Sequence, residues 1–396
     1  MSRSIKKSLL VIAISARPFV AAAIEAGYQV TAIDGFADQQ TVDLTHVAIL
    51  VAYNEYGFNA TALLGEIAKL DATQYLGFVY GSGFEAQPDL LEAISGTIPL
   101  IGNVSSSVKA VKTPARFFAT LKLANIAHPK TYLQPTMDPL AGYLQKFSGG
   151  CGGTHIKIVT DKVSRFENNR YYQEKIEGQP VSLLFLACAN KIAPVGFNEQ
   201  WISSTTAMPF RFGGAVSQIK LNLSLQKQMI EAAKVLTQQF NLVGLNSLDG
   251  IVQDDIFYVL EINPRLSASF DLYATDSVEQ NLMDLHIQAS LNHNLLLTMD
   301  IDKSVPVIPR SKACVVIYAI EDMSISATFA WPDWVIDCPY SQDKNDDIRL
   351  LAGQPICSVV AQADDAGVAK EIVDTRVKII NNLLQIGLKR DEYASL

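Results

Sequence analysis

The sequence predicts an α/β protein of several domains, with parallel strands in its first part and a two-stranded hairpin carrying polar residues further on. Strand and helix signals alternate along residues 1–105, which is typical of parallel strands joined by crossover helices. Later, a strand ends in a polar tip made by Glu261, Asn263 and Arg265. The length of 396 residues is enough for two to four domains.

The composition excludes several classes of protein. Apolar residues make up 49% of the chain and charged residues 18%, which predicts ordered domains with buried cores. The formal net charge of −8 argues against a nucleic-acid partner. Five dispersed cysteines without a CxxC pair predict reduced thiols in a cytoplasmic protein and no zinc site. Charges, prolines or glycines interrupt every long apolar stretch, so we expect no membrane partner.

The N-terminal segment has some features of a secretory signal. Basic residues precede an apolar run at 9–14, and three alanines follow at 21–23. However, Arg17 and Pro18 interrupt the run after only a few residues. We therefore expect a buried first strand.

We expect residues 1–105 to form a Rossmann-like domain. The dinucleotide fingerprint GxGxxG is absent after the first strand, so we do not expect NAD to bind there. The strands are predicted at 9–14, 29–33, 47–53 and 77–80, and the helices at 18–26, 61–70 and 90–95.

The remaining chain divides into three parts by its patterns: a small unit at 106–180, a larger unit at 181–300 and a C-terminal part at 301–396. The small unit is predicted to hold a helix at 114–125, strands at 131–133, 142–145 and 171–176, and a glycine-rich loop. The larger unit is predicted to hold strands at 181–188, 244–252 and 256–262 and helices at 224–240 and 278–291. In the last part we expect strands at 313–320 and 355–361 and a helix at 368–384.

The polar strand tip is the most informative motif. Side chains on a strand alternate between its two faces, so Glu261, Asn263 and Arg265 should share one face. Burying three such groups together is costly unless they are used or paired. Two oxygen donors followed by a cation suit a magnesium-bound polyphosphate and an anionic substrate.

Asp249 lies on the preceding strand, and its partner depends on register. A two-residue turn at Asp254 and Asp255 would pair Asp249 with Leu260 and place Glu261 on the other face. One further residue in the loop, or a bulge, would pair Asp249 with Glu261. We predict the second arrangement because a metal site requires both carboxylates on one face.

These motifs, taken in order, resemble the ATP-grasp superfamily of carboxylate ligases. After the Rossmann-like domain come Lys146 with the glycines at 149–153, the segment Gln173-Glu174-Lys175-Ile176-Glu177-Gly178, then Asp249, and finally the "LEINPR" strand. The resemblance covers residues 1–300 and implies a two-lobed ATP-grasp core at 106–300, with the small lobe at 106–180 and the large lobe at 181–300. The part at 301–396 resembles the small β-rich domain of biotin-carboxylase-like members.

The resemblance implies a role for each group in binding nucleotide and metal. Asp249, Glu261 and Asn263 would hold Mg²⁺, with Mn²⁺ as an alternative ion. Lys146 would contact the ATP phosphates, and either Lys112 or Arg116 would be a second cation. The loop glycines that would cover the phosphates are Gly149, Gly150, Gly152 and Gly153. The hinge residues that would contact adenine and ribose are Glu174, Lys175, Ile176 and Glu177.

The resemblance also implies a reaction, the joining of a carboxylate to an amine through an acyl phosphate. Arg265 would act on the carboxylate, with Ser267 and Ser269 as further substrate contacts. The small-molecule substrates are not readable from the sequence, although attachment of glutamate in cofactor biosynthesis fits the pattern. We leave a homodimer open.

Two alternatives remain at this stage: a bicarbonate-activating enzyme of the biotin-carboxylase type, and a nucleotide-binding module without catalysis. Two residues near the loop also need an interpretation. Cys151 has no histidine arranged beside it as in a cysteine nucleophile, so we interpret it as a small loop residue. We expect a structural or surface role for His155.

Overall fold

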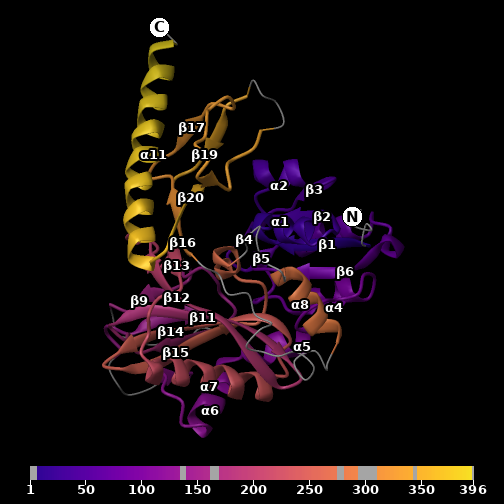
Figure 1. Cartoon of the computed structure of the whole chain (residues 1–396), viewed down its shortest axis with the longest axis vertical. Helices are drawn as coiled ribbons and strands as arrows, with labels where there is room; N and C mark the ends of the chain where they lie inside the picture. Colours follow the sequence, from indigo (N-terminus) through magenta and orange to yellow (C-terminus); the bar gives the residue numbers. More distant parts are fainter. Residues whose placement is uncertain are drawn as a thin grey trace.

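In the computed structural model, the chain begins with a parallel sheet (Figure 1). The structure describes residues 7–133, 140–160, 169–273, 281–292, 310–341 and 346–394. The strand order is β3-β2-β1-β6, and each neighbouring pair is parallel, as the alternating pattern predicted. The strands are β1 (Ser8–Ala13), β2 (Gln29–Asp34), β3 (Val47–Leu50) and β6 (Tyr75–Tyr80).

Local sequence explains where the helices around this sheet begin. Pro18 occupies the first turn of α1, where its missing N–H is not needed. Asp38 and Asn59 cap the next two helices through their side-chain oxygens. The helices are α1 (Arg17–Glu25), α2 (Gln39–Leu44), α3 (Ala60–Ile67) and α4 (Asp89–Ser95), and a short hairpin is formed by β4 (Tyr53–Asn54) and β5 (Gly57–Phe58).

Two helices and a small antiparallel sheet follow. The sheet has the order β7-β10-β8-β9, so β8, which carries Lys146, is an inner strand. Its strands are β7 (Thr131–Tyr132), β8 (Leu144–Phe147), β9 (Lys157–Ile158) and β10 (Arg170–Gln173), and the helices are α5 (Ser105–Val111) and α6 (Pro114–Leu123).

The largest element is an eight-stranded sheet of order β15-β14-β11-β12-β13-β16-β20-β18. Its strands are β11 (Gln179–Cys188), β12 (Lys191–Ile202), β13 (Phe212–Ser217), β14 (Gly244–Gln253), β15 (Ile256–Asn263), β16 (Ser311–Tyr318), β18 (Val335–Ile336) and β20 (Pro355–Ala363). Helix α7 (Leu223–Phe240) buries one apolar side in the core beneath this sheet. Its start is capped by Asn222 and its end is the left-handed Asn241.

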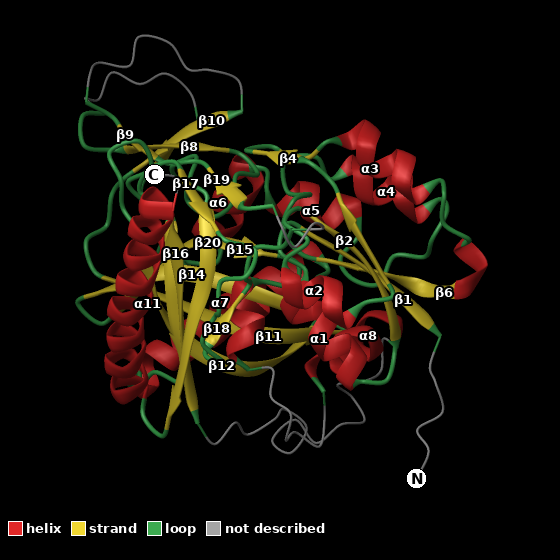
Figure 2. Cartoon of the chain, turned by 90° about the horizontal axis from the view of Figure 1, so that it is seen from above, coloured by secondary structure: helices red, strands yellow, loops and turns green. Residues whose placement is uncertain are grey.

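The C-terminal part continues the same sheet. Strand β16 pairs with β13, and β20 pairs with β16, so hydrogen bonds run without a break from β13 into β16 and β20. Helix α11 (Ala366–Ala394) lies along β16 and β20 (Figures 1 and 2), beside a small two-stranded sheet of β17 (Met323–Ile325) and β19 (Ile348–Leu350). The sequence pattern did not reveal this continuity, and the boundary at 300 remains a prediction.

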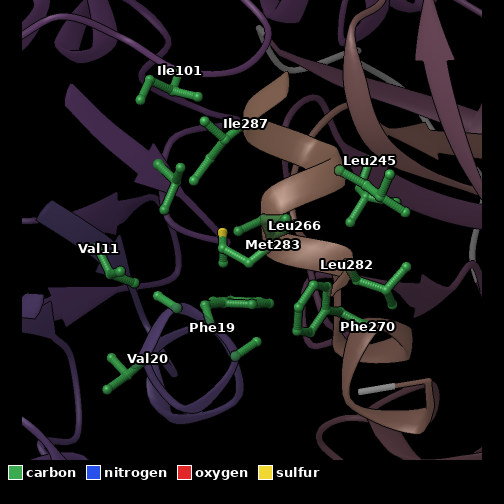
Figure 3. Packing of buried hydrophobic residues seen from close by; sticks show 14 of the residues in the cluster. Val11, Phe19, Val20, Ile101, Leu245, Leu266, Phe270, Leu282, Met283 and Ile287 are labelled. Carbon is green, nitrogen blue, oxygen red and sulfur yellow. The ribbon is translucent and has the colours of Figure 1, made fainter. Parts of the chain in front are cut away.

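A hydrophobic core joins the first sheet to the segment that follows the polar strand. Phe19 of α1 packs edge to face against Phe270, with their ring centres 5.3 Å apart. Phe270 lies in the 3₁₀ helix η2 (Ala268–Leu272). Leu266 and Met283 lie in the same cluster, the latter on α8 (Leu282–Leu291), as Figure 3 shows. Because these side chains are fully buried, the chain just after Arg265 is anchored against the first domain.

Strands β12 and β13 are among those that the sequence patterns missed. Strand β12 contains Pro194 and Gly196, and Gly213 and Gly214 lie in β13. Such residues are typical of loops rather than strands. In the structure Gly196 packs directly against the hydroxyl end of Tyr273, which leaves no space for a side chain there. Of the predicted helix at 278–291, residues 278–280 lie outside the described residues.

Within the described residues, no helix is long and apolar enough to cross a membrane.

Candidate active site

The hairpin of β14 and β15 brings the two acidic residues together as predicted. Its turn has only two residues, Asp254 and Asp255, both with positive φ. The register then shifts beyond Gly250, so that Asp249 pairs with Glu261 and Leu260 becomes the extra residue of a bulge. The bulge, and not a longer loop, is what places both carboxylates on one face.

Asp249 is held by two hydrogen bonds at the base of this face. The Ser247 hydroxyl donates to one carboxylate oxygen at 2.8 Å, and the Asn263 amide donates to the other at 2.8 Å. Burial and the nearby charge of Glu261 raise the pKa of Asp249 above its ordinary value. Asn263 is therefore oriented with its carbonyl oxygen directed away from Asp249 and towards the cations.

Lys112, at the end of α5, lies at the centre of the cluster. Its ammonium donates to Glu261 Oε2 at 3.0 Å and to Asn263 Oδ1 at 3.2 Å. Burial alone would raise the pKa of Glu261, but the charge and hydrogen bond of Lys112, together with Lys146 and His155, outweigh it and the pKa is lowered. Arg116 lies elsewhere, with its guanidinium 5.5 Å from the centre of the Phe240 ring. Of the two cations left open by the sequence, the structure brings only Lys112 to the acidic pair.

Lys146 is a buried ammonium with a neutral partner. Its side chain lies on β8 and donates to Gln173 Oε1 at 2.7 Å, and the residue is only 6% exposed. Among the described residues it forms no ion pair within 4 Å. Burial is the largest effect on Lys146 and lowers its pKa to about 8, and Lys112 adds to this while Glu261 opposes it.

The glycine-rich loop is docked against two other parts of the molecule. Gly149 lies on the backbone of Glu85 and Ala86, and Gly153 lies on the carbonyl of Phe210, so that a side chain at either position would overlap backbone atoms. Gly149, Gly152 and Gly153 all have positive φ. The glycines therefore allow the loop to pack closely against neighbouring backbone and also to adopt positive φ angles.

Arg265 is held in place by Glu85, a residue that the sequence analysis missed. Its guanidinium Nε bonds to the Glu85 carboxylate, Nη1 donates to the Leu266 carbonyl at 3.0 Å, and Nη2 donates to Asn263 Oδ1 at 3.4 Å. The Glu85 carboxylate also accepts the N–H groups of Gly83 and Phe84. The sequence contained a pattern that could have indicated Glu85. It follows soon after the parallel strand β6, and ligands bind beyond the carboxyl ends of parallel strands.

The other predicted residues make contacts of their own, apart from those of Lys112 and Glu261. The hydroxyls of Ser267 and Ser269 are buried and 2.8 Å apart. Glu174 follows β10, and its backbone N–H donates to the Lys130 carbonyl at 2.8 Å. Lys175 pairs with Glu177 at 2.5 Å, and the Glu177 side chain is largely exposed, while Ile176 lies between them in the link to β11.

A small pocket lies between the loop and Glu261. Lys112 and Glu261 line one side, and Gly149, Gly150 and His155 line another. The Glu261 side chain remains 39% exposed here, so its carboxylate is accessible from the pocket. Cys151 in the loop is no nucleophile, because burial raises the pKa of its thiol to about 12 and keeps it protonated at neutral pH.

The donor set fits a hard divalent cation. Oxygens of Glu261 and Asn263 already converge on one cation, the Lys112 ammonium, and Asp249 is the cross-strand neighbour of Glu261. Carboxylate and carboxamide oxygens are the ligands that Mg²⁺ prefers. Among the described residues, no group of three or more His, Cys, Asp or Glu side chains forms an all-protein metal site. The set therefore suits an ion that takes further oxygens from a phosphate.

Comparison with known proteins identifies the domain that carries this site. The sequence profile of the ATP-grasp domain matches residues 114–269, which include Lys146, the loop and the β14–β15 hairpin. The match assigns residues 114–269 to the ATP-grasp domain family. This confirms the resemblance inferred from the ordered motifs.

Sequence relatives of this chain include two amine ligases. The tyramine–L-glutamate ligase of Methanocaldococcus fervens is 28% identical over 201 residues, which are 50% of this chain and 60% of that protein. The enzyme of the same name from Methanocaldococcus jannaschii is 27% identical over 172 residues, 43% of this chain and 49% of that protein. The chain thus matches only about half to three fifths of the length of these relatives.

Solved structures share the fold of this chain over nearly its whole length. Biotin carboxylase from Campylobacter jejuni superposes with a TM-score of 0.68 and 13% identity, covering 92% of this chain and 89% of that one. L-amino acid ligase from Bacillus licheniformis superposes with a TM-score of 0.65 and 13% identity, covering 93% and 97%. At these identities the likeness shows the fold alone.

Proposed function

We propose that this protein is an ATP-dependent ligase that activates a carboxylate as an acyl phosphate and joins it to an amine. The observation that carries the proposal is Lys146, a buried ammonium beside the docked glycine loop whose hydrogen-bond partner is the neutral Gln173. A buried charge without a counter-charge is unfavourable. The phosphates of ATP would supply the missing negative charge.

The nucleotide would lie between the loop and the hairpin. Lys112 and Lys146 would offset the charge of the phosphates, and the loop docked through Gly149 and Gly153 would exclude water from them. The link at Glu174–Glu177 would contact the adenosine. Asp249, Glu261 and Asn263 would hold Mg²⁺ or Mn²⁺, which when bound supplies positive charge to phosphate oxygens.

Arg265 would hold the acid substrate. Glu85 grips one side of the guanidinium, which orients the remaining N–H groups towards Asn263 and the phosphate region. The substrate carboxylate attacks the γ-phosphorus, and ADP leaves as the acyl phosphate forms. The amine then attacks the acyl carbon, loses a proton and expels phosphate. Arg265 stabilises the oxygen that becomes negative in each step, and positioning of two mutually repelling anions supplies much of the rate.

For the substrates, we propose an amino acid such as glutamate and a small amine, in a cytoplasmic step of cofactor biosynthesis. The support is that two relatives are tyramine–L-glutamate ligases, which match this chain over 201 and 172 residues. We infer no nucleic-acid partner, in keeping with the net charge of −8.

The test is a screen for ADP release over pairs of amino acids and amines. We expect ADP only when an acid is present and a condensed product only when an amine is added. ADP release with bicarbonate and biotin in place of these pairs would instead support a biotin-carboxylase-type activity. Nucleotide binding without ADP release under any pair would identify a non-catalytic module.

A further inference from the structure

Three aromatic side chains gather on the surface beside the glycine-rich loop, and the proposed mechanism gives them no role. Phe36 follows β2, Tyr53 lies on β4, and Tyr56 lies in the turn between β4 and β5. Their exposed fractions are 39%, 37% and 42%, and no other aromatic residue of the described chain is as exposed. Exposed apolar side chains that gather in one place often mark a binding surface.

Phe36 and Tyr53 lie at the edge of the first sheet where ligands bind. Strands β2 and β3 are parallel neighbours, and these two residues follow their carboxyl ends by two and three positions. Ligands of such sheets bind beyond the carboxyl ends of the strands. The two rings pack edge to face, with their centres 5.4 Å apart. Gly35 allows this arrangement, since a side chain there would overlap the Tyr53 ring.

The aromatic cluster of Phe36, Tyr53 and Tyr56 adjoins the glycine-rich loop. Tyr56 packs edge to face on Phe147, with ring centres 5.1 Å apart, and Phe147 lines the pocket. Within the loop, Cys151 is an electrostatic neighbour of Tyr53 and also of Arg265. The cluster is therefore close both to the pocket and to the group that would hold the acid substrate.

The chemistry of the cluster indicates a ligand with a flat apolar group. Asp34, two residues before Phe36, is fully buried and accepts the backbone N–H groups of Ala16 at 3.0 Å and of Phe36 at 2.7 Å. Its carboxylate is thus used within the protein and is not offered to a cation. Aromatic side chains bind other rings favourably through edge-to-face and offset-stacked contacts. Sites for small molecules are lined mainly by apolar and aromatic side chains.

The proposed reaction leaves one reactant without a binding group. The phosphates have Lys112 and Lys146, and the acid has Arg265, but no residue named so far holds the amine. The amine nitrogen must be uncharged when it attacks the acyl carbon, so the amine is better held by its carbon skeleton than by a counter-charge. An aromatic surface close to Arg265 meets this requirement.

We propose that Phe36, Tyr53 and Tyr56 bind the amine substrate and that this substrate carries an aromatic ring. The inference rests on the proposed function and adds to it the class of the second substrate. All three residues lie outside residues 114–269, so they belong to a part of the chain that the ATP-grasp domain match does not describe. Contact of the substrate ring with the cluster positions the nitrogen towards the acyl phosphate at Arg265.

The test compares two primary amines, 2-phenylethylamine and propylamine, on the full-length protein. The value of kcat/KM for each amine is measured from product formation at saturating ATP and Mg²⁺, with an acid that supports ADP release in the screen. We expect the wild type to prefer 2-phenylethylamine at least about tenfold, because its ring fills an apolar site. Tyr53→Leu and Phe36→Leu keep an apolar side chain but remove a ring, and each should reduce this preference at least about threefold.

Two further variants separate the effect of the ring from a disturbed fold. Tyr53→Phe keeps the ring and should keep the preference within about twofold of the wild type. Phe329→Leu is a matched control, because it also breaks an edge-to-face pair, with the Trp331 ring centre 4.6 Å away, but lies in the C-terminal core cluster. It should leave the preference unchanged. The KM for the acid should stay within about twofold of the wild type in every variant, and thermal unfolding checks that each is folded.

The outcomes separate this inference from the proposed function. Equal use of the two amines by the wild type, or equal losses for both amines in Tyr53→Leu and Phe36→Leu, would overturn the aromatic site and leave the ligase reaction intact. A loss of preference in Phe329→Leu or Tyr53→Phe as large as in Tyr53→Leu would also overturn it, since the ring at position 53 would then not be the cause. Absence of ADP release with every acid and amine would overturn the proposed function, and this inference with it.

Discussion

The protein contains two clusters of buried charge that differ in how their charges are used. In the candidate site, Lys112 bonds to Glu261 and Asn263, and the Glu261 side chain is 39% exposed to the pocket. In the second cluster, Arg17 of α1 bonds to Asp271 of η2 at 3.0 Å and to Asp337 at 2.5 Å. There the side chains of Arg17 and Asp271 are 10% and 11% exposed.

In the second cluster, both cations have carboxylate partners. Lys312 of β16 also bonds to Asp271 at 3.2 Å, so Arg17 and Lys312 are each paired with residues distant in the sequence. In the candidate site, by contrast, Lys146 has a neutral partner and Glu261 is accessible. The comparison teaches that complete pairing marks a structural link between domains, whereas incomplete pairing beside a pocket marks a site for an anion and a cation.

The largest expected effect concerns the candidate site. Glu261→Ala removes a carboxylate from the proposed metal site, so we expect turnover in the ADP-release assay to fall at least about a thousandfold. Glu199→Ala is a matched control, because Glu199 also pairs with a lysine, Lys370, at 2.7 Å but lies away from the pocket lining. Unchanged turnover in Glu261→Ala would remove the metal assignment.

The contribution of the second cluster, around Arg17 and Asp271, is tested by measuring the stability of the protein. Asp271→Asn leaves Lys312 and part of Arg17 without an anion in a buried place, so we expect the free energy of unfolding in urea to fall by about 3 kcal/mol. Lys220 and Asp365 offer a control, since this pair is exposed and Asp365→Asn should cost less than about 1 kcal/mol. Equal losses in the two variants would contradict the distinction between buried and exposed pairs.

The pH dependence of the Asp271 effect sharpens the same comparison. Burial alone would raise the pKa of Asp271, but Arg17 and Lys312 outweigh it and hold the pKa well below its ordinary value. A lowered pKa in the folded state gives stability that is present above the pKa of the unfolded chain and is lost as the pH falls towards the folded pKa. The difference in stability between the wild type and Asp271→Asn should therefore be full above about pH 5 and should shrink below about pH 4. A difference that stays constant down to pH 2.5 would argue against the charge interaction.

Packing of the glycine-rich loop against Phe210 is tested by substituting two neighbouring glycines, Gly152 and Gly153. Both Gly152 and Gly153 have positive φ, but only at Gly153 would a side chain overlap a backbone carbonyl, that of Phe210. We expect Gly153→Ala to lower turnover about tenfold more than Gly152→Ala, since both share the backbone strain and differ in the clash. Similar rates for the two variants would show that docking at Phe210 is unimportant for the reaction.

The smallest expected effect concerns the cation that the structure places away from the site. Arg116→Ala removes a contact with the Phe240 ring, and we expect a loss of stability below about 1 kcal/mol with nucleotide affinity within twofold of the wild type. Lys112→Ala is the comparison and should weaken ATP binding at least about tenfold. A larger loss of affinity in Arg116→Ala than in Lys112→Ala would reverse the assignment of the second cation.

Short-range patterns predicted much of the local structure. The alternating pattern predicted the parallel sheet, and the spacing of apolar residues predicted α7, because both depend on periodicity within a few residues. The bulge between Asp249 and Glu261 was predicted only through the chemistry that it allows, since a two-residue turn by itself implies the other register. Strands β12 and β13 were not predicted, because their glycines and Pro194 are accommodated by neighbours distant in sequence.

By itself, the sequence determined the class of the fold, the order of its motifs and the face of β15 that carries Glu261, Asn263 and Arg265, because side-chain direction along a strand is a local property. Only the tertiary structure decided that Lys112 and not Arg116 reaches the acidic pair, that Glu85 grips Arg265, and that the C-terminal strands continue the large sheet. Each of these contacts joins residues between 95 and 180 positions apart. Such contacts depend on how the domains pack, and no local pattern in the sequence carries that information.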